Sequence, residues 1–196
     1  VVQVAILGLV ILGDTLSMAG VIAIIISFFG VTVLSVSQSK ISWASLLKGL
    51  TEKPTLIGLA SGVFLGASVV FYRGGALSLG GDGFIMQAAY ALAVATVVQT
   101  VMMGVYLKIR EPGQITAVLK YWRPALMVGI AGVVGSVGWF TAFTIQNAAY
   151  VRAVGQIELV FMFLTSIFIF KEKSNAMEIL GILAIIAGIL ILLLGK

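Results

Sequence analysis

The sequence contains neither cysteine nor histidine among its 196 residues. Their absence excludes disulfide bonds, thiol nucleophiles, Cys/His zinc sites and histidine acid–base chemistry. The chain also lacks the Gly-x-Ser-x-Gly pattern of a serine nucleophile. We therefore expect no metal site, no cofactor and no enzymatic activity.

Charged residues are scarce as well. Asp, Glu, Lys and Arg make up 10% of the chain, whereas a soluble domain carries roughly 25%. Apolar residues make up 61%, and the mean hydropathy is +1.19. A soluble fold of this composition would expose large apolar patches, which aggregate. The composition therefore indicates an integral membrane protein, and we expect a multi-pass protein of the cell (inner) membrane.

Seven continuous apolar runs follow one another along the chain. The first ends at Gly13 and Asp14 and is too short to span a bilayer, so we expect the chain to begin inside a transmembrane helix. The other six can each cross about 30 Å of hydrocarbon at about 1.5 Å per residue; they cover residues 18–36, 55–73, 84–107, 124–146, 150–170 and 176–195. Barrel strands would alternate polar and apolar residues, so the runs predict an all-α, polytopic transmembrane helix bundle. The three prolines stand at run boundaries or in loops, and we expect no proline-broken helix.

The basic residues lie in the gaps between these runs. Because they form no continuous stripe, the net charge of +5 indicates membrane loops and not a nucleic-acid interface. Nine of the twelve lie in residues 37–54, 108–123 and 171–175, which predicts that these loops are cytoplasmic. Residues 41–50 and 115–122 combine apolar, aromatic and basic side chains, as do short helices that lie in the membrane surface; ordinary loops are the alternative.

Small residues recur at the spacing that lets helices approach closely in lipid. They form three sets in three different runs: Gly58, Gly62 and Gly66; Gly129, Gly132 and Ser136; and Gly181, Ala184 and Gly188. We expect these residues to pack helices and not to bind substrate.

The first hairpin can be superposed on the last at an offset of 158 residues. Asp14 then falls on Glu172, Gly30 on Gly188, and Ile11 on Ile169. The second copy begins five spans after the first, and because five is odd, the two copies run through the membrane in opposite directions. Inverted repeats of this kind are typical of secondary transporters.

These residues carry a resemblance to a known family. The turns Leu-Gly-Asp at 12–14 and Phe-Lys-Glu at 170–172, the late glycines Gly30 and Gly188, and the helix containing Glu158 resemble the EamA-type branch of the drug/metabolite transporter superfamily. The resemblance implies ten helices in two inverted five-helix repeats, of which this chain holds helices four to ten. It also implies a cytoplasmic C-terminus, which the count of basic residues contradicts. This family often has Leu-Gly-Glu at the turn and Glu-Pro in the ninth helix, and this chain departs from both patterns.

The resemblance also divides the chain. Residues 1–36 would be the end of the first repeat, residues 37–54 an interfacial loop, and residues 55–196 the second five-helix repeat. The family's cavity draws mainly on helices that match 55–73, 124–146 and 150–170 here.

Polar and aromatic residues gather between Gly138 and Glu158. Glu158 lies well inside a predicted span, where an acid costs about 2.5–3.5 kcal/mol, so such residues usually face an interior cavity. We predict a substrate-binding cavity with aromatic walls, amide hydrogen-bonding groups and two charges, formed by Trp139, Phe140, Phe143, Gln146, Asn147, Arg152, Gln156 and Glu158, with Tyr72 and Tyr90 from earlier spans. In the alternative interpretation, Glu158 pairs with Arg152 or with a neighbouring helix end, and the aromatic rings pack between helices without lining a cavity.

The expected function is secondary transport of small metabolites, such as amino acids or related solutes, in the direction of export and by alternating access. Glu158 is a candidate for a coupling proton, and coupling to a counter-solute and a homodimer are left open. The alternatives are a flippase for lipid-linked substrates and a structural membrane subunit that transports nothing.

Overall fold

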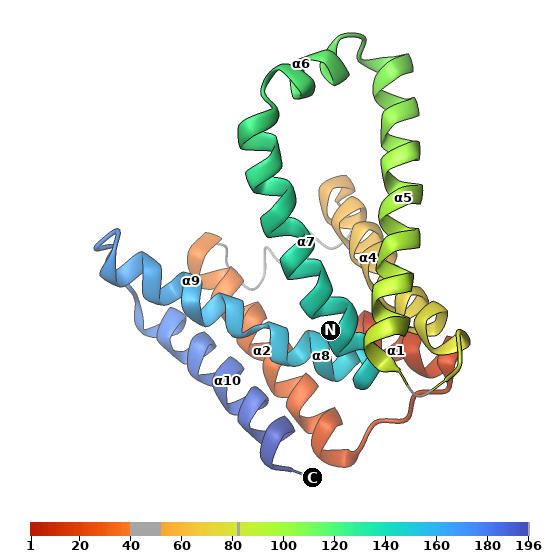
Figure 1. Ribbon diagram of the computed structural model, residues 1–196. Coiled ribbons are helices and arrows are strands. Elements are labelled where there is room, and N and C mark those ends of the chain that lie inside the picture. Colours follow the sequence, from red (N-terminus) through yellow and green to blue (C-terminus); the bar gives the residue numbers. More distant parts are fainter. Residues whose placement is uncertain (40–51, 82, 196) are drawn as a thin grey trace. The chain divides into compact units, whose positions relative to one another are not determined.

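The computed structural model describes residues 1–39, 52–81 and 83–195, and all regular structure in this part of the chain is helical (Figure 1). The helices are α1 (Val2–Leu12), α2 (Met18–Ser39), α4 (Lys53–Ser78), α5 (Phe84–Arg110), α6 (Gln114–Lys120), α7 (Trp122–Ile145), α8 (Ala148–Gly155), α9 (Ile157–Phe168) and α10 (Ala176–Leu194). The prediction of an all-α, polytopic helix bundle is confirmed. The amphipathic segment 41–50 lies outside the described residues.

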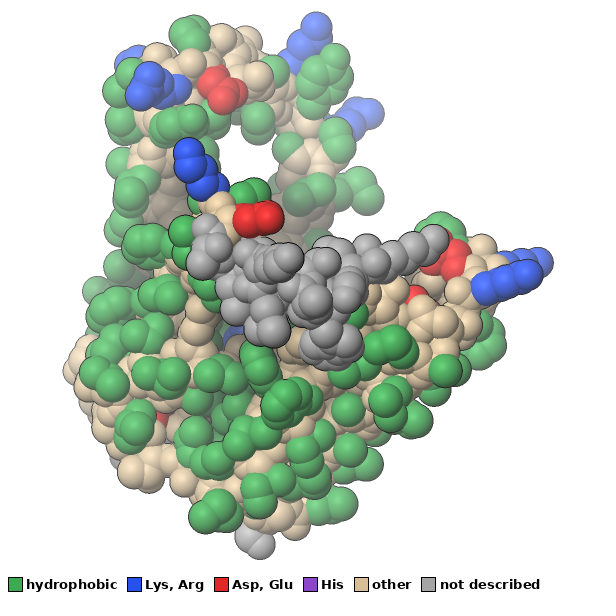
Figure 2. Space-filling view, turned by 180° about the vertical axis from the view of Figure 1, so that it is seen from behind, with side chains coloured by type: hydrophobic (Ala, Val, Ile, Leu, Met, Phe, Trp, Pro, Cys, Tyr) green, Lys and Arg blue, Asp and Glu red, His purple; other side chains and the backbone are tan. Residues whose placement is uncertain are grey.

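Six spans in the described ranges are long and apolar enough to cross a membrane: α2, α4, α5, α7, α10, and α8 together with α9. These are the six complete runs of the sequence. Pro54 and Pro124 stand in the first turns of α4 and α7, where a missing N–H group breaks no helical hydrogen bond. Large apolar side chains are exposed along most of these helices, and Figure 2 shows them over most of the visible surface. Exposure on this scale is expected where lipid is the solvent.

The chain forms two compact units. The first comprises Val1–Val70 and Asn147–Lys196, and the second comprises Phe71–Gln146. Helix α4 contributes to both, with its N-terminal part in the first unit and its last two turns in the second.

In the first unit, the hairpin α1–α2 and the hairpin α9–α10 repeat the same turn. A residue with left-handed backbone precedes the acid in both, Gly13 with φ 69° and Lys171 with φ 54°. The acid's N–H then donates to the carbonyl six residues earlier: Asp14 to Gly8 at 3.1 Å, and Glu172 to Ser166 at 3.1 Å. Every equivalent pair is separated by the predicted offset of 158.

The helix that follows each turn begins in the same way. Ser17 Oγ accepts a hydrogen bond from the Gly20 N–H at 3.1 Å, and Asn175 Oδ1 accepts one from the Glu178 N–H at 2.9 Å. Ser17 and Asn175 are again 158 residues apart, as are Gly20 and Glu178. Both caps satisfy an N–H group that has no partner within the helix. The repeat predicted from a few identities is therefore confirmed in the turns and caps of the two hairpins.

Helices α2 and α10 pack antiparallel, side by side (Figure 1). A Cβ atom added to Gly30 would lie 2.9 Å from the Gly181 carbonyl oxygen and 3.0 Å from the Ile185 N. A Cβ atom added to Gly188 would lie 2.9 Å from the Ala23 carbonyl oxygen and 3.2 Å from the Ser27 N. The second set of contacts is the first shifted by 158, so the two hairpins meet across a pseudo-two-fold axis.

Buried apolar residues of the same region, Leu34, Val160, Ile182, Ile185 and Ile189, form a hydrophobic core around this contact. Both the antiparallel direction and the symmetric contacts are what an inverted repeat requires.

The three glycine sets behave differently. Gly181 and Gly188 approach backbone atoms of α2, and Gly62 and Gly66 approach Gln3 and Val4 of α1. Gly58, Gly129 and Gly132 have no close neighbour within the described residues. The packing role expected for small residues therefore holds for the last set and for part of the first. Small-residue spacing alone does not say which face of a helix has a partner.

In the second unit, α5 and α7 pack against each other and α6 connects them. A surface helix and an ordinary loop were both open for residues 115–122, and most of this segment lies in helix α6, which begins at Gln114. Arg110 and Lys108 stand in the last turn of α5, where the helix dipole favours positive charge.

Candidate functional site

The span at residues 148–168 is interrupted. Helix α8 ends at Gly155 and α9 begins at Ile157, with Gln156 between them at φ −63° and ψ −8°. The Gln156 N–H donates to the Ala153 carbonyl at 3.2 Å, and the Leu159 N–H donates to the Gln156 carbonyl at 3.0 Å. Both bonds span three residues, as in a 3₁₀ turn, which in mid-helix often marks a hinge. The span expected over 150–170 is present, and its helix is interrupted at Gln156.

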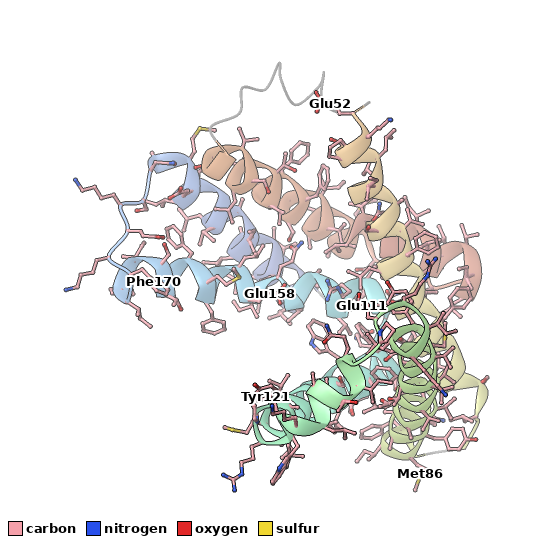
Figure 3. The ribbon with its side chains drawn as sticks, turned by 90° about the horizontal axis from the view of Figure 1, so that it is seen from above. Glu52, Met86, Glu111, Tyr121, Glu158 and Phe170 are labelled. Carbon is pink, nitrogen blue, oxygen red and sulfur yellow. The ribbon has the colours of Figure 1, made fainter. Side chains whose placement is uncertain are left out.

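Two polar groups without partners lie at this interruption. The side-chain carbonyl oxygen of Gln156 is buried and accepts no hydrogen bond from the described residues. The Glu158 side chain is exposed in the first turn of α9, and it makes no hydrogen bond or ion pair within the described part of the chain (Figure 3). Glu158 is ten residues after Ala148, or about 15 Å along the span at about 1.5 Å per residue, which is half of a bilayer of about 30 Å. The interruption therefore places an acid near the middle of the membrane.

Glu158 shares one face of α9 with Phe161 and Thr165, three and seven residues further on. The opposite face of α9, which includes Leu159 and Phe163, packs on the core formed with α2 and α10. Glu158 thus points away from the centre of its own unit. Burial in a cavity, as the sequence suggested, stays a prediction.

Helix α8 and its N-cap hold two of the predicted site residues, Asn147 and Arg152, and also Tyr150. Asn147 caps its N-terminus and accepts a hydrogen bond from the Ala149 N–H at 2.9 Å. Tyr150 accepts a hydrogen bond from the Ser17 N–H at 2.7 Å through its hydroxyl, which ties α8 to the first hairpin. Arg152 lies half-buried in the last turn. Asn147 therefore has a structural partner, and its role in substrate binding stays a prediction.

The second unit contains an aromatic and amide cluster. The rings of Tyr72 and Phe140 lie 4.7 Å apart, and those of Trp139 and Phe143 stack at 5.5 Å. The Gln99 side-chain amide donates to the Tyr72 hydroxyl at 2.8 Å. These contacts bring together residues from α4, α5 and α7.

A pocket of about 350 Å³ opens beside this cluster between α4 and α5. Tyr72, Tyr90 and Gln99 supply polar groups, and Phe71 and Val98 contribute to its apolar wall. This volume is within the range of small-molecule sites, about 300–1,000 Å³. An apolar pocket with a few directed hydrogen-bonding groups can hold a small amphipathic solute.

Arg73 fixes the end of α7 in the same unit. Its Nη1 donates to the carbonyl of Phe143 at 2.7 Å and to that of Gln146 at 2.8 Å. These carbonyls belong to the last turn of α7 and its cap, where helices leave acceptors unsatisfied and the dipole favours a cation. Arg73 therefore caps the C-terminal end of α7.

Comparison with known proteins identifies the fold. The EamA-like transporter family matches residues 52–194, which include α4 to α10. The chain belongs to this family. Neither a curated protein nor a solved structure matches the chain.

Membership of the EamA-like transporter family places the chain in the drug/metabolite transporter superfamily. The chain is therefore a multi-pass membrane protein with the fold of a transporter, which acts on a small-molecule substrate in a lipid environment.

The ten residues proposed for the site divide between the two units. Asn147, Arg152, Gln156 and Glu158 belong to the first, and Tyr72, Tyr90, Trp139, Phe140, Phe143 and Gln146 belong to the second. Within the second unit, Tyr72 is in contact with Phe140, and Tyr72 and Tyr90 line one pocket.

Gln99 was not among the site residues predicted from the sequence. Gln99 lies on the span 84–107, which the resemblance made less important, yet it hydrogen-bonds to Tyr72. The available signal was an amide side chain within an apolar run, which needs a hydrogen-bonding partner.

Proposed function

We propose that this chain mediates secondary transport of small metabolites, such as amino acids or related solutes, in the direction of export across the inner membrane. The observation that carries the proposal is the interruption at Gly155–Gln156, with the unpaired Glu158 one turn away. Irregular backbone at membrane depth is tolerated only where it is buried in protein or lines a wet cavity. Discontinuous helices that bind substrate or ions near the midplane are a recurring feature of secondary transporters.

The energetics of the interruption favour a coupled process. An ionised acid at the helix centre costs about 2.5–3.5 kcal/mol, and an unsatisfied buried acceptor such as Gln156 Oε1 costs about 1–3 kcal/mol. Water, a proton or a polar solute would relieve both costs. We therefore propose that Glu158 carries a coupling proton and that the 3₁₀ turn is a hinge for alternating access.

Solute recognition is assigned to the pocket lined by Tyr72, Tyr90 and Gln99. The Tyr72 hydroxyl accepts from Gln99 and keeps its own O–H free to donate to a solute carboxylate or carbonyl. The apolar walls would accept a side chain or an aliphatic body. An amino acid or a related amphipathic metabolite fits this combination.

The test is transport by the purified chain in liposomes loaded with a panel of amino acids. We expect accumulation driven by a pH gradient in the wild type, loss of that accumulation in Glu158→Gln, and a raised KM with little change in kcat in Tyr72→Phe. Glu111→Gln is the matched control, because Glu111 is an exposed acid outside the spans, in the turn between α5 and α6.

Normal accumulation by Glu158→Gln would refute the coupling role. The absence of transport for every solute, with a folded wild-type protein, would refute the proposed activity.

A further inference from the structure

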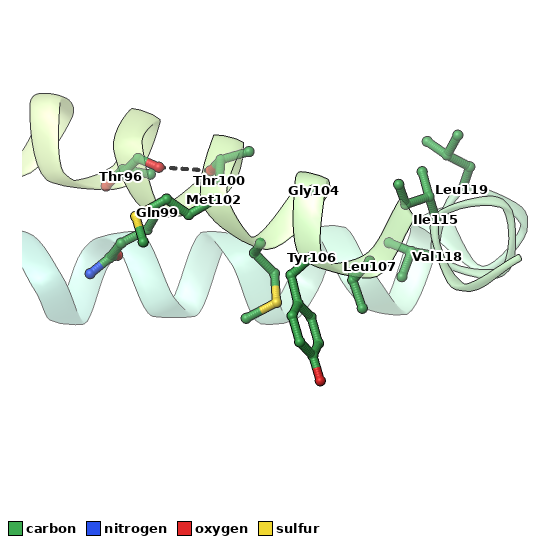
Figure 4. Close-up of a pocket in the computed structure, with 11 residues that line it drawn as sticks. Thr96, Gln99, Thr100, Met102, Gly104, Tyr106, Leu107, Ile115, Val118 and Leu119 are labelled. Carbon is green, nitrogen blue, oxygen red and sulfur yellow. Dashed lines mark hydrogen bonds between the residues drawn. The ribbon is translucent and has the colours of Figure 1, made fainter. Parts of the chain in front are cut away.

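A long apolar groove runs along α5 and continues under α6 (Figure 4). Its volume is about 840 Å³, and its lining includes Met102, Met103, Tyr106, Leu107, Val118 and Leu119. The polar residues at its inner end are Thr96, Gln99 and Thr100. The Thr100 hydroxyl donates to the Thr96 carbonyl at 2.7 Å, so its proton is already used, and the rest of the lining is mainly apolar.

The groove has the length of one lipid leaflet. From Thr96 to Leu107 the chain advances eleven residues, or about 16 Å at about 1.5 Å per residue. Half of a hydrocarbon core of about 30 Å is about 15 Å. A groove of this depth that ends at a surface helix has the dimensions of an acyl chain extending from its headgroup.

Positive charge surrounds the α6 end of the groove. Lys108 and Arg110 stand in the last turn of α5, Lys120 ends α6, and Arg123 is the second residue of α7. All four are exposed, and none makes an ion pair or hydrogen bond with the described residues. The turn between α5 and α6 contributes one acid, Glu111. Figure 2 shows Lys and Arg side chains gathered at this end of the α5–α7 pair.

Aromatic residues hold two of these cations at headgroup level. The Lys120 Nζ lies 6.0 Å from the centre of the Tyr121 ring, and the Arg123 guanidinium lies 5.6 Å from the centre of the Trp122 ring. Tyr and Trp are enriched where the hydrocarbon meets the headgroups. The cations therefore stand at the depth of lipid phosphates.

We propose that this groove is a binding site for one anionic phospholipid. An acyl chain lies along α5 from Leu107 toward Thr96, and the phosphate is bound by Lys120 and Arg123 with support from Lys108 and Arg110. A transmembrane helix of a second copy could cover the apolar lining, but an apolar helix would leave the four cations without an anion. A phospholipid matches both parts of the surface, because its acyl chain covers the apolar lining and its phosphate pairs with the cations.

The experiment uses the full purified chain and does not depend on transport. The protein is incubated in micelles containing equal amounts of phosphatidylglycerol and phosphatidylcholine with identical acyl chains, and retained lipid is counted by native mass spectrometry. We expect the wild type to retain phosphatidylglycerol preferentially. In the double variant Lys120→Gln/Arg123→Gln, this preference should fall about tenfold. Each cation near the surface contributes about fivefold before screening by salt, and screening reduces the combined effect of the two.

Two matched control variants test whether lipid retention depends on these particular cations and on an open groove. Lys171→Gln/Lys173→Gln removes the same charge in the first unit and should leave the preference unchanged. Gly104→Leu places a side chain into the groove where a Cβ meets no atom within 4 Å, and it should reduce retention of both lipids. Gly138→Leu, at another glycine with an open Cβ position, should not.

An equal preference for phosphatidylglycerol in Lys120→Gln/Arg123→Gln and in the control Lys171→Gln/Lys173→Gln would overturn the proposal. So would a wild-type dimer that Gly104→Leu dissociates without any change in retained lipid, because a second copy would then occupy the groove.

Discussion

Replacing Gly30 or Gly188 with alanine tests the close contact of α2 and α10. At both positions the added methyl group would lie 2.9 Å from a backbone carbonyl oxygen of the facing helix. Because backbone cannot rotate away as a side chain can, the helices must separate by about 0.5–1 Å, which forfeits a quarter to a half of each affected dispersion contact. Overpacking of this kind costs about 1–3 kcal/mol.

The contact has a symmetry that sharpens the prediction. Since the surroundings of Gly30 and Gly188 are equivalent at an offset of 158, the two single variants should be destabilised to a similar extent. One separation of the helices accommodates both methyl groups, so the double variant should lose less stability than the sum of the singles.

The assay is the midpoint of thermal unfolding in detergent, with Gly138→Ala as the control. No described atom lies within 4 Å of a Cβ built on Gly138, and alanine is favoured over glycine within a helix by about 0.5–1 kcal/mol. The control should keep or raise the midpoint, while Gly30→Ala and Gly188→Ala lower it by several degrees. Midpoints for these two variants at or above that of the control would show that the helices are not in the close contact described.

Three further predictions concern single residues. Arg73→Gln should destabilise the protein by about 1–3 kcal/mol, because it leaves carbonyls at the end of α7 unsatisfied. Arg73→Lys should restore only part of the lost stability, and an unchanged unfolding midpoint in Arg73→Gln would contradict the capping role. Gly20→Ala should be more destabilising than Tyr150→Phe, because the added methyl group would lie 2.5 Å from the Tyr150 ring. Tyr150→Phe removes only the hydroxyl group, which lowers stability by about 1 kcal/mol, and the reverse order in the same unfolding assay would contradict this prediction. Lys171→Gly should raise the midpoint by an amount equivalent to about 1 kcal/mol, because left-handed backbone is costly for residues other than glycine and the repeat has Gly13 at the equivalent place; a lower midpoint would show that the Lys171 side chain contributes more than its backbone costs.

The spans and the hairpin repeat could be predicted because each depends on local information. A run of about 20 apolar residues must cross the bilayer as a helix, since no water is available to its backbone groups. The repeat survives in the sequence because a left-handed turn, an acid and a cap each restrict the residue type at one position. The pairing of Asp14 with Glu172, together with that of Gly30 with Gly188, indicated the offset, although Lys171 occupies the position of Gly13.

The interruption of the penultimate span could not be predicted in this way. Gly155 and Gln156 are compatible with a continuous helix, and neither is a proline. The two segments make different tertiary contacts: α8 packs mainly on α1 and accepts a hydrogen bond from Ser17 through Tyr150, while α9 packs mainly on α10. Two sets of tertiary contacts orient the two segments, and the backbone between them adapts.

By itself, the sequence determined that this is a helical membrane protein with inverted hairpins, because hydrophobic length and turn chemistry are properties of single segments. Only the tertiary structure decided which polar groups meet: Gln99 with Tyr72, Arg73 with the end of α7, and Glu158 with none of the described residues. Pairing across helices depends on rotation and register, and these are set by packing between segments far apart in the chain.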